Sequence, residues 1–297
     1  MNMDDYEIDK RLVRTSFDRA ADHYDECAVL QREVGNRLLE RLDCIHLQPG
    51  CIIDAGAGTG HQSRLLLDKF ADATVFSLDL SKRMLQTNRQ VSSRQTRQEF
   101  ICADIEQLPL ASHSVDLLFS NLTLQWVQNY DALFDEINRV LKPGGLLLFT
   151  SFGPDTLIEL RSSWAAVDQQ VHVNAFIDMH DIGDAMVRAG LADPVMDVEH
   201  IQLTYPDAWQ LMRELKQIGA HNMSRGRHHR ITGKQRFLAM IAAYEQFRSD
   251  GRLPASYEII YGHAWGTGTN RQQAAADGGV AIPVSAIRRR RRGGPVI

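Results

Sequence analysis

The sequence predicts an α/β protein built on a doubly wound parallel sheet, because three apolar runs each end in residues suited to ligand binding. The first run, Ile52 to Ala55, leads into a turn with glycine at every second position. The second run, Thr74 to Asp79, and the third, Phe100 to Asp104, each end in an aspartate. Ligands of doubly wound sheets bind at the carboxyl ends of the strands, so we expect the three ends to form one site.

The glycine turn itself indicates which kind of ligand this is. Its glycines, Gly56, Gly58 and Gly60, let the backbone approach a ligand where a Cβ would collide. The spacing departs from the dinucleotide pattern G-x-G-x-x-G, and the carboxylate of Asp54 ahead of the glycines would repel a pyrophosphate. A carboxylate suits an amine instead, so the turn favours S-adenosylmethionine over NAD.

The two aspartates at the other strand ends extend this predicted cofactor site. Asp79 stands where doubly wound sheets place the acid that accepts hydrogen bonds from ribose hydroxyls. We expect Asp104 and Ile105 to meet the adenine edge. The residues expected to bind the cofactor are Asp54, Gly56, Gly58, Gly60, Asp79, Leu80, Asp104, Ile105 and Asn121.

The order of predicted elements supports the sheet. Apolar residues at helical spacing predict helices over Ile8 to Ala21 and Val29 to Leu42, which would form a lid or flank before the sheet. Strand and helix then alternate from Cys51 to Phe152, with helices over Lys82 to Val91 and Asn129 to Leu141. This alternation is typical of a parallel sheet.

The second half of the chain is predicted to close the sheet and to recognise the substrate. Gly153 to Leu203 is rich in helix formers, and specificity is expected there. Strands are predicted over His200 to Tyr205 and Tyr257 to Trp265, with helices over Ala208 to Ile218 and Lys234 to Phe247 between them. The predicted parts are a helical lid (1–46), a cofactor-binding core (47–152), a recognition part with the closing strands (153–268) and a flexible Arg-rich tail (269–297), in which 280–284 is a candidate edge strand.

Composition bounds the location and the partners. The 297 residues carry a formal net charge of −4, which gives no overall attraction to nucleic acid or to an anionic membrane. No apolar run reaches the roughly 18 residues of a membrane span, and Met1 to Asp5 lacks the basic and apolar parts of a signal peptide. We therefore expect a cytoplasmic protein.

Neither disulfides nor a metal site are predicted. Without C-x-x-C spacing, four residues are expected to be buried, reduced thiols: Cys27, Cys44, Cys51 and Cys102. The candidate ligands His172, His180 and Asp181 lack the spacing of a metal site, so no metal is expected.

Further motifs connect the chain to a known superfamily. Val115 to Asn121 and Leu141 to Gly145, together with the glycine turn and the strand-end acids, resemble class I S-adenosylmethionine-dependent methyltransferases over Leu47 to Phe152. The stretch Phe17 to Gln31 resembles the N-terminal signature of one subgroup, and this resemblance implies that Tyr24 approaches the sulfonium.

A finer resemblance covers residues 10 to about 265. The chain is similar to the malonyl-acyl-carrier-protein O-methyltransferases of biotin synthesis in five stretches: Phe17 to Gln31, Asn121 to Trp126, Ser151 to Arg161, Phe176 to Asp184 and Arg213 to Asn222. The resemblance implies methyl esterification of the free carboxylate of a malonyl thioester, with S-adenosylhomocysteine as the other product. Because a carboxylate is already ionised at neutral pH, no general base is expected.

That reaction assigns roles to several basic residues. Arg161 is the candidate for holding the substrate carboxylate, since a planar guanidinium pairs well with carboxylates. An acyl-carrier protein bearing malonyl-phosphopantetheine is acidic, so we expect it to dock on a basic cluster. The cluster consists of Arg225, Arg227, Arg230, Lys234 and Arg236. The run Arg288 to Arg292 lacks interleaved aromatic residues and predicts no nucleic-acid module.

Alternative functions remain open at the level of the sequence. A methyltransferase for another small acid or alcohol would share the cofactor half of the chain. A methyltransferase-like respiratory-complex assembly factor that hydroxylates an arginine, or a non-enzymatic S-adenosylmethionine-binding module, would share the fold. The acidic start of the chain argues against mitochondrial import. The sequence does not distinguish a carrier-protein thioester from a coenzyme A thioester.

Overall fold

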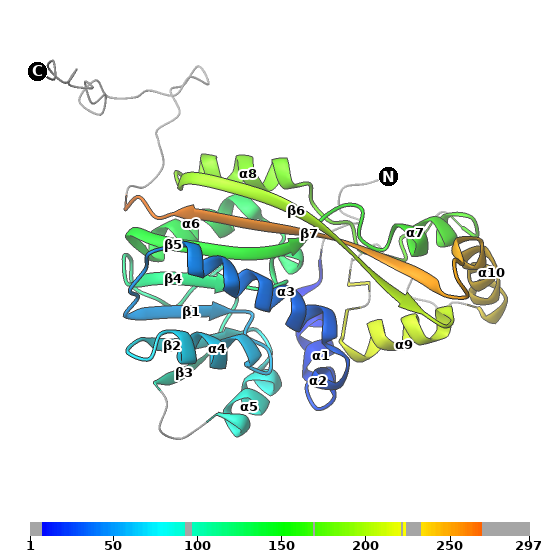
Figure 1. Cartoon of the computed structure of the whole chain (residues 1–297), viewed down its shortest axis with the longest axis horizontal. Helices are drawn as coiled ribbons and strands as arrows, with labels where there is room; N and C mark the ends of the chain where they lie inside the picture. Colours follow the sequence, from blue (N-terminus) through cyan, green and yellow to red (C-terminus); the bar gives the residue numbers. More distant parts are fainter. Residues whose placement is uncertain (1–7, 93–96, 169, 221, 224–232, 269–297) are drawn as a thin grey trace, which may run out of the picture.

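A seven-stranded sheet in the order β3-β2-β1-β4-β5-β7-β6 forms the centre of the protein (Figure 1). The computed structural model describes residues 8–92, 97–168, 170–220, 222–223 and 233–268. The first five strands are parallel, and β7 runs antiparallel to both β5 and β6. The doubly wound sheet with a closing antiparallel hairpin is therefore confirmed. The strands are β1 (Cys51–Ala55), β2 (Thr74–Asp79), β3 (Gln98–Cys102), β4 (Val115–Ser120), β5 (Leu141–Phe152), β6 (Ala192–Tyr205) and β7 (Leu253–Trp265).

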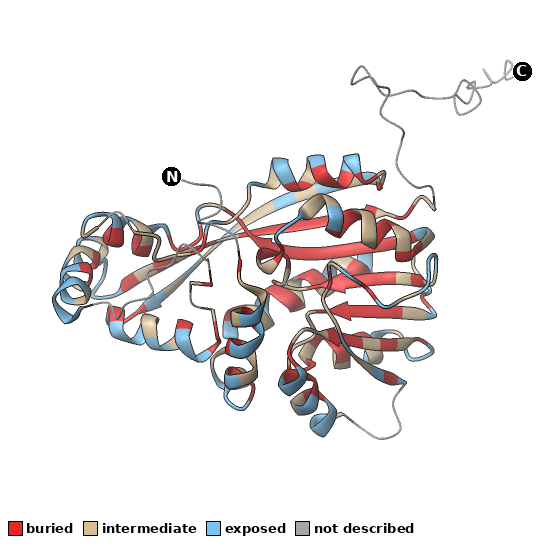
Figure 2. Cartoon of the chain, turned by 180° about the vertical axis from the view of Figure 1, so that it is seen from behind, coloured by how far each residue is buried: buried red, intermediate tan, exposed pale blue. Residues whose placement is uncertain are grey.

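Helices cover both faces of this sheet, because successive strand residues point to opposite sides. Ile52 packs in one hydrophobic cluster with residues of α3 (Val29–Glu40) and α4 (His61–Lys69). Its neighbour Ile53 packs in a second cluster with α6 (Tyr130–Val140) and α8 (Met179–Arg188). Figure 2 shows the central strands buried, with exposed residues on the outer helix faces. Helix α5 (Lys82–Val91) contacts β2 and β3.

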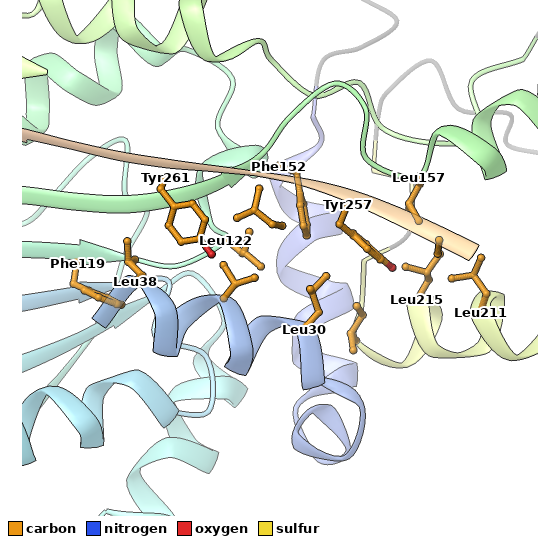
Figure 3. Close-up of a cluster of buried hydrophobic side chains, with 14 of the residues drawn as sticks. Leu30, Leu38, Phe119, Leu122, Phe152, Leu157, Leu211, Leu215, Tyr257 and Tyr261 are labelled. Carbon is orange, nitrogen blue, oxygen red and sulfur yellow. The ribbon is translucent and has the colours of Figure 1, made fainter. Parts of the chain in front are cut away.

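The β6–β7 hairpin extends past the rest of the sheet. Strand β5 pairs with β7 only as far as Phe152 opposite Ile259, whereas β6 and β7 stay paired to Tyr205 opposite Leu253. Helices α7 (Ile158–Ala165), α9 (Ala208–Gln217) and α10 (Lys234–Tyr244) gather around this overhang (Figure 1). Figure 3 shows how Tyr257 of β7 lies between side chains of α3 and α9, so the core continues beneath the hairpin.

The N-terminal helices reach across to this second part of the chain. Helix α1 (Lys10–Ala20) begins at Asp9, whose carboxylate accepts the N–H groups of Arg11 and Leu12. The Ser16 hydroxyl donates to the Gly219 carbonyl at 3.2 Å. The short α2 (Tyr24–Cys27) contacts α9. Three 3-10 turns complete the described elements: η2 (Arg41–Cys44), η3 (Leu124–Trp126) and η4 (Glu245–Phe247).

Two expectations are corrected by the structure. The segment Gly153 to Leu203 carries not only α7 and α8 but also most of β6, which begins at Ala192 rather than near His200. The start of this edge strand is hard to recognise in the sequence because Pro194 and Val195, which is 50% exposed, interrupt the alternation of apolar and polar residues. The four cysteines are free as expected, but none of them is fully buried, and Cys27 and Cys51 are only partly covered. Cys102, at the end of edge strand β3, and Cys44, in a surface turn, are both exposed.

Some sequence predictions concern residues outside the described part of the chain. The Arg-rich tail and its candidate strand fall in residues 269–297, outside the described residues. Among the described helices, none combines the length and apolarity needed to cross a bilayer. The division into lid, core and recognition part stays a prediction.

The glycine turn after β1 generates a test of packing. Gly60 and Gly58 both have positive φ, +84° and +54°, so alanine at either position would pay the left-handed penalty of about 1–2 kcal/mol. A Cβ on Gly60 would also lie 2.0 Å from the buried amide of Asn88, whereas one on Gly58 meets nothing within 4 Å. In urea unfolding we expect Gly60→Ala to lower the free energy of unfolding clearly more than Gly58→Ala. Equal losses would contradict the packing role of Gly60.

Candidate functional site

A pocket lies at the carboxyl ends of β1 and β2, where α1 and α2 pass over the sheet. We call it the strand-end pocket; it comprises two adjoining cavities that share Tyr24, Gly56, Gly58 and Asn121. Of the residues predicted to bind the cofactor, its walls contain Asp54, Gly56, Gly58, Asp79, Leu80, Asp104, Ile105 and Asn121. Gly60 is not part of the lining, because it packs behind the turn against Asn88.

The backbone of the glycine turn is held in place by β2. The N–H groups of Gly56 and Ala57 donate to the Leu78 carbonyl at 2.7 and 3.0 Å. The Gly58 N–H donates to Asp79 Oδ2 at 2.9 Å, and the Ser81 N–H donates to Oδ1 of the same carboxylate at 2.7 Å. The turn is therefore fixed with open space in front of Gly58, where a ligand can approach the backbone.

Two acids in this pocket have unusual titration behaviour. Burial raises the pKa of Asp79 to about 6, although the two backbone N–H donors favour its charged form. Asp54 is 1% exposed, and burial raises its pKa to about 7 against the opposing hydrogen bond from the Ser63 hydroxyl at 2.5 Å. A cation placed nearby would stabilise the charged form of both carboxylates.

The third strand-end acid is engaged by the N-terminal helix. Lys10 Nζ lies 2.6 and 2.7 Å from the two carboxylate oxygens of Asp104, and it also pairs with Glu106. This ion pair joins α1 to the far side of the pocket. Sequence reasoning did not single out Lys10, and a lysine at a helix start carries no signal of so distant a partner.

Aromatic side chains cover the opening between the strand ends. Phe17 makes edge-on contacts with Tyr24 and Trp126, with ring centroids 6.5 and 5.6 Å apart. Burial and the charges of Asp79 and Asp25 raise the pKa of the Tyr24 hydroxyl, so it stays protonated at neutral pH. Tyr24 thus brings a neutral hydroxyl to the place where the two cavities meet.

The cavity beside Asp54 is chemically suited to an amino acid. The amide oxygens Oε1 of Gln31 and Gln62 are buried and have no hydrogen-bond partner among the described residues, so both can accept from an ammonium group. Arg32 in the same lining offers a cation for a carboxylate. The Asn121 side chain donates to the Gln31 carbonyl at 2.8 Å and accepts from Thr150 at 2.8 Å.

Sequence reasoning missed most of this lining, including Arg32, Gln62 and His61. Gln31 belonged to the quoted N-terminal stretch, and Arg32 is the next residue in the chain. His61 lines the same cavity, and its Nε2 lies 3.2 Å from Asn36 Oδ1. The expectation that no general base takes part stays a prediction.

Arg161 does not share the strand-end pocket. Its guanidinium donates to the carbonyls of Pro154 and Thr156, each at 2.8 Å, and it lines a different cavity beside α7. Of the basic cluster predicted for docking, Lys234 and Arg236 are exposed on α10. The other three members, Arg225, Arg227 and Arg230, lie outside the described residues.

Among the described residues, one group has ligand atoms close enough for a metal. Asp155, His200 and Glu258 bring their ligand atoms within 4.8 Å of one another. The group lies away from the strand-end pocket lining, and exposed acids of this kind are common without a metal. The expected absence of a metal cofactor stays a prediction.

The raised pKa of Asp54 predicts the direction of a stability change with pH. Because its folded pKa of about 7 exceeds the unfolded value near 3.8, the free energy of unfolding should fall as pH rises from 5 to 8, by about 3 kcal/mol. Asp54→Asn, with an amide that can still accept from Ser63, should lose this part of the slope, while Asp79 keeps a smaller one. Urea unfolding at several pH values measures both slopes.

Asp116 provides a matched control for this measurement. Its pKa is lowered, since hydrogen bonds from Lys142 and two backbone N–H groups outweigh burial. Asp116→Asn should therefore shift the free energy of unfolding equally at every pH between 5 and 8. A wild-type protein with no more slope than Asp54→Asn would overturn the assignment.

Comparisons with solved structures agree with the fold. YcgJ of Bacillus subtilis aligns with a TM-score of 0.56 and 14% identity, covering 77% of this chain and 97% of that one. The [4+2]-cyclase SpnF aligns with a TM-score of 0.51 and 18% identity, covering 79% and 80%. At such identities the likeness shows the fold alone, and the cyclase illustrates that this fold hosts other reactions.

Comparisons at the level of sequence are closer. A family model described as a methyltransferase domain matches residues 53–149. The malonyl-acyl-carrier-protein O-methyltransferase of Methylovorus sp. strain MP688 is 52% identical over 271 residues, which cover 89% of this chain and 92% of that protein. The protein of the same name from Laribacter hongkongensis is 50% identical, covering 91% and 94%. The chain belongs to the malonyl-acyl-carrier-protein O-methyltransferase family.

Proposed function

We propose that this protein transfers the methyl group of S-adenosylmethionine to the free carboxylate of malonyl-acyl-carrier protein, an early step of biotin synthesis. The observation that carries the proposal is an identity of about half over about nine-tenths of the chain to relatives of that activity. Such coverage includes the helices around the β6–β7 overhang as well as the methyltransferase domain. The product is a methyl ester and S-adenosylhomocysteine.

We assign the strand-end pocket to the cofactor. The amino group of its methionine part is placed against the unpaired amide oxygens of Gln31 and Gln62 and beside Asp54, and its carboxylate at Arg32. Asp79 keeps lone pairs for the ribose hydroxyls, because each carboxylate oxygen accepts only one backbone N–H. Asp104 and Ile105, with Leu80, are assigned to the adenine end. The methionine part of the cofactor carries an ammonium and a carboxylate. The two amide oxygens without a partner among the described residues suit the ammonium and the guanidinium suits the carboxylate, and this supports the assignment.

The chemistry requires alignment rather than proton transfer. The bound cofactor supplies an electrophilic methyl group on a sulfonium, and the malonyl carboxylate attacks it in line while already ionised. The chain orients the two reactants and excludes water, which the aromatic cover of Phe17, Tyr24 and Trp126 supports. We assign the protonated Tyr24 hydroxyl to the position beside the methyl group.

The carrier protein is assigned to the face that carries α10. Lys234 and Arg236 are exposed there, and a basic surface attracts an acidic partner. The role of Arg161 in holding the malonyl carboxylate stays a prediction. In the structure its guanidinium donates to two backbone carbonyls beside α7. A cytoplasmic location, where carrier proteins and the cofactor are made, is part of the same proposal.

Methyl transfer itself tests the proposed function. With radiolabelled S-adenosylmethionine, malonyl-acyl-carrier protein should gain base-labile label, because a methyl ester hydrolyses in alkali. Acetyl-acyl-carrier protein, which lacks a free carboxylate, is the control and should gain none. Labelling of both, or of neither while the cofactor still binds, would favour another small acid or alcohol as substrate or a non-methylating protein of this fold.

Arg32 allows a test of the cofactor's orientation. If its guanidinium holds the methionine carboxylate, Arg32→Gln should weaken S-adenosylhomocysteine binding about tenfold to a hundredfold, since hydrogen bonds to charged groups contribute about 1.5–3 kcal/mol. Binding of 5′-methylthioadenosine, which lacks that carboxylate, should not change. Calorimetry measures both, with the exposed Arg188→Gln on α8 as control. Equal weakening of the two ligands would remove Arg32 from this role.

A further inference from the structure

A further cavity lies among the helices that gather around the overhanging end of the β6–β7 hairpin. It has a volume of about 610 Å³, and α7, α9, α10 and the segment 172–176 enclose it. We call it the helical cavity. Its lining shares no residue with the strand-end pocket, so the proposed cofactor site does not account for it.

One face of α9 packs into the core, and a neighbouring face lines the helical cavity. Ala208, Leu211 and Leu215 are buried at a spacing of three and four residues and pack into the core. A second stripe at the same spacing is Trp209, Met212, Arg213 and Lys216, and all four line the helical cavity. Trp209 is 51% exposed, and its ring contacts that of Phe237 with centroids 4.6 Å apart.

The helical cavity is apolar with one polar wall. Leu157, Leu160 and Phe176 supply its apolar surface. The polar wall centres on His172, whose ring stacks on Trp164 with centroids 3.7 Å apart. His172 Nε2 lies 2.8 Å from the Asp168 carboxylate. Because an ionised carboxylate can only accept, Nε2 is the donor in this hydrogen bond, and in a neutral imidazole Nδ1 is then the acceptor. Asn174 and Asn222 complete this wall.

Two cations stand at the exposed rim of the helical cavity. Arg213 and Lys216 are both exposed, and neither has an ion-pair partner among the described residues. On the proposed function the malonyl carboxylate has to reach the methyl group in the strand-end pocket. These cations are therefore suited to a different anion of the same substrate, at its opposite end.

The described residues 219–220 and 222–223 border the helical cavity on one side and residues of the strand-end pocket on the other. Ala220 and Asn222 line the helical cavity. On the other side of the same segment, a Cβ on Gly219 would lie 3.5 Å from the ring of Phe17, and Met223 packs in one cluster with Val13. Both Phe17 and Val13 line the strand-end pocket, so a long ligand that passes this segment reaches both.

We propose that the helical cavity binds the phosphopantetheine arm of the substrate, with its phosphodiester at Arg213 and Lys216 and its amide groups along the wall of His172. The arm is a chain of two amides and a dimethyl-substituted carbon between a phosphate and a thioester, which matches a cavity that is apolar, polar on one wall and cationic at the rim. This inference rests on the proposed function and adds where the substrate binds.

Three thioester substrates distinguish the contribution of the arm to activity from the contributions of the carrier protein and of the malonyl group. Malonyl-acyl-carrier protein and malonyl-coenzyme A both contain the arm, whereas malonyl-N-acetylcysteamine contains only its thioester end. Two variants alter the helical cavity: Met212→Trp fills part of its volume, and Lys216→Glu reverses a charge at its rim. We expect both to lower kcat/KM at least tenfold for the two arm-bearing substrates and less than twofold for the short thioester.

Matched controls lie on neighbouring surfaces. Gln210→Trp adds the same side chain to the exposed side of α9 outside the cavity lining, and Arg188→Glu makes the same charge reversal on α8. Neither should change kcat/KM. Unchanged S-adenosylhomocysteine binding shows that a variant is folded. Loss with the carrier-protein substrate alone, equal loss with all three substrates, or no loss would each overturn the proposal.

Direct binding keeps the inference separate from the proposed function. Titration with 4′-phosphopantetheine should change the fluorescence of Trp209, and Lys216→Glu should weaken that binding at least tenfold. Trp209→Phe identifies the signal. If the wild type methylates none of the three thioesters but binds 4′-phosphopantetheine in this way, the proposed function fails and the cavity assignment stands. Absence of binding overturns the assignment.

Discussion

The hydrogen bond from the Gly58 N–H to the Asp79 carboxylate is the constraint on which the cofactor region depends. It ties the turn after β1 to the end of β2, and the Ser81 N–H fixes the same carboxylate from the other side. Because the carboxylate is held by two backbone donors, its position does not depend on side-chain rotamers of neighbours. A replacement of Asp79 therefore changes the turn as well as any contact with a ligand.

The buried acids give the site its electrostatic character. Asp54 and Asp79 both have raised pKa values, for which burial is the first cause. Burial leaves these carboxylates without a positive charge to stabilise their ionised form. A ligand with an ammonium and a sulfonium would supply that positive charge. Burying these ionised carboxylates costs stability at neutral pH, and such perturbed acids are a common feature of functional sites.

The sequence predicted the parts of the site that lie next to each other in the chain. Strand ends followed by Gly56 or Asp79 carry a local pattern, so the sheet and the strand-end acids followed from spacing alone. Lys10 could not be found this way, because its partner Asp104 is 94 residues away and no local pattern links them. The position of Arg161 after β5 predicts that it holds the substrate carboxylate, and this stays a prediction; in the structure its guanidinium donates to two carbonyls of the loop that precedes α7.

The helical cavity was hidden for a related reason. The stripe of α9 that carries Trp209 and Lys216 has the mixed composition of a solvated helix face, and only the approach of α7 and α10 turns it into a wall. The start of β6 is hard to predict because Pro194 and the exposed Val195 interrupt the alternation of apolar and polar residues in the sequence. Both features depend on tertiary contacts that single-sequence periodicity does not contain.

Strand β7 belongs both to the central sheet and to the overhang. It pairs with β5 inside the central sheet and continues, still paired with β6, into the overhang around which α7, α9 and α10 gather. A continuous strand has no hinge, so the overhang keeps a fixed place relative to the central sheet. With the arm bound as proposed, the enzyme would select its substrate by the distance between a carboxylate and a phosphate along a flexible chain, rather than by the carboxylate alone.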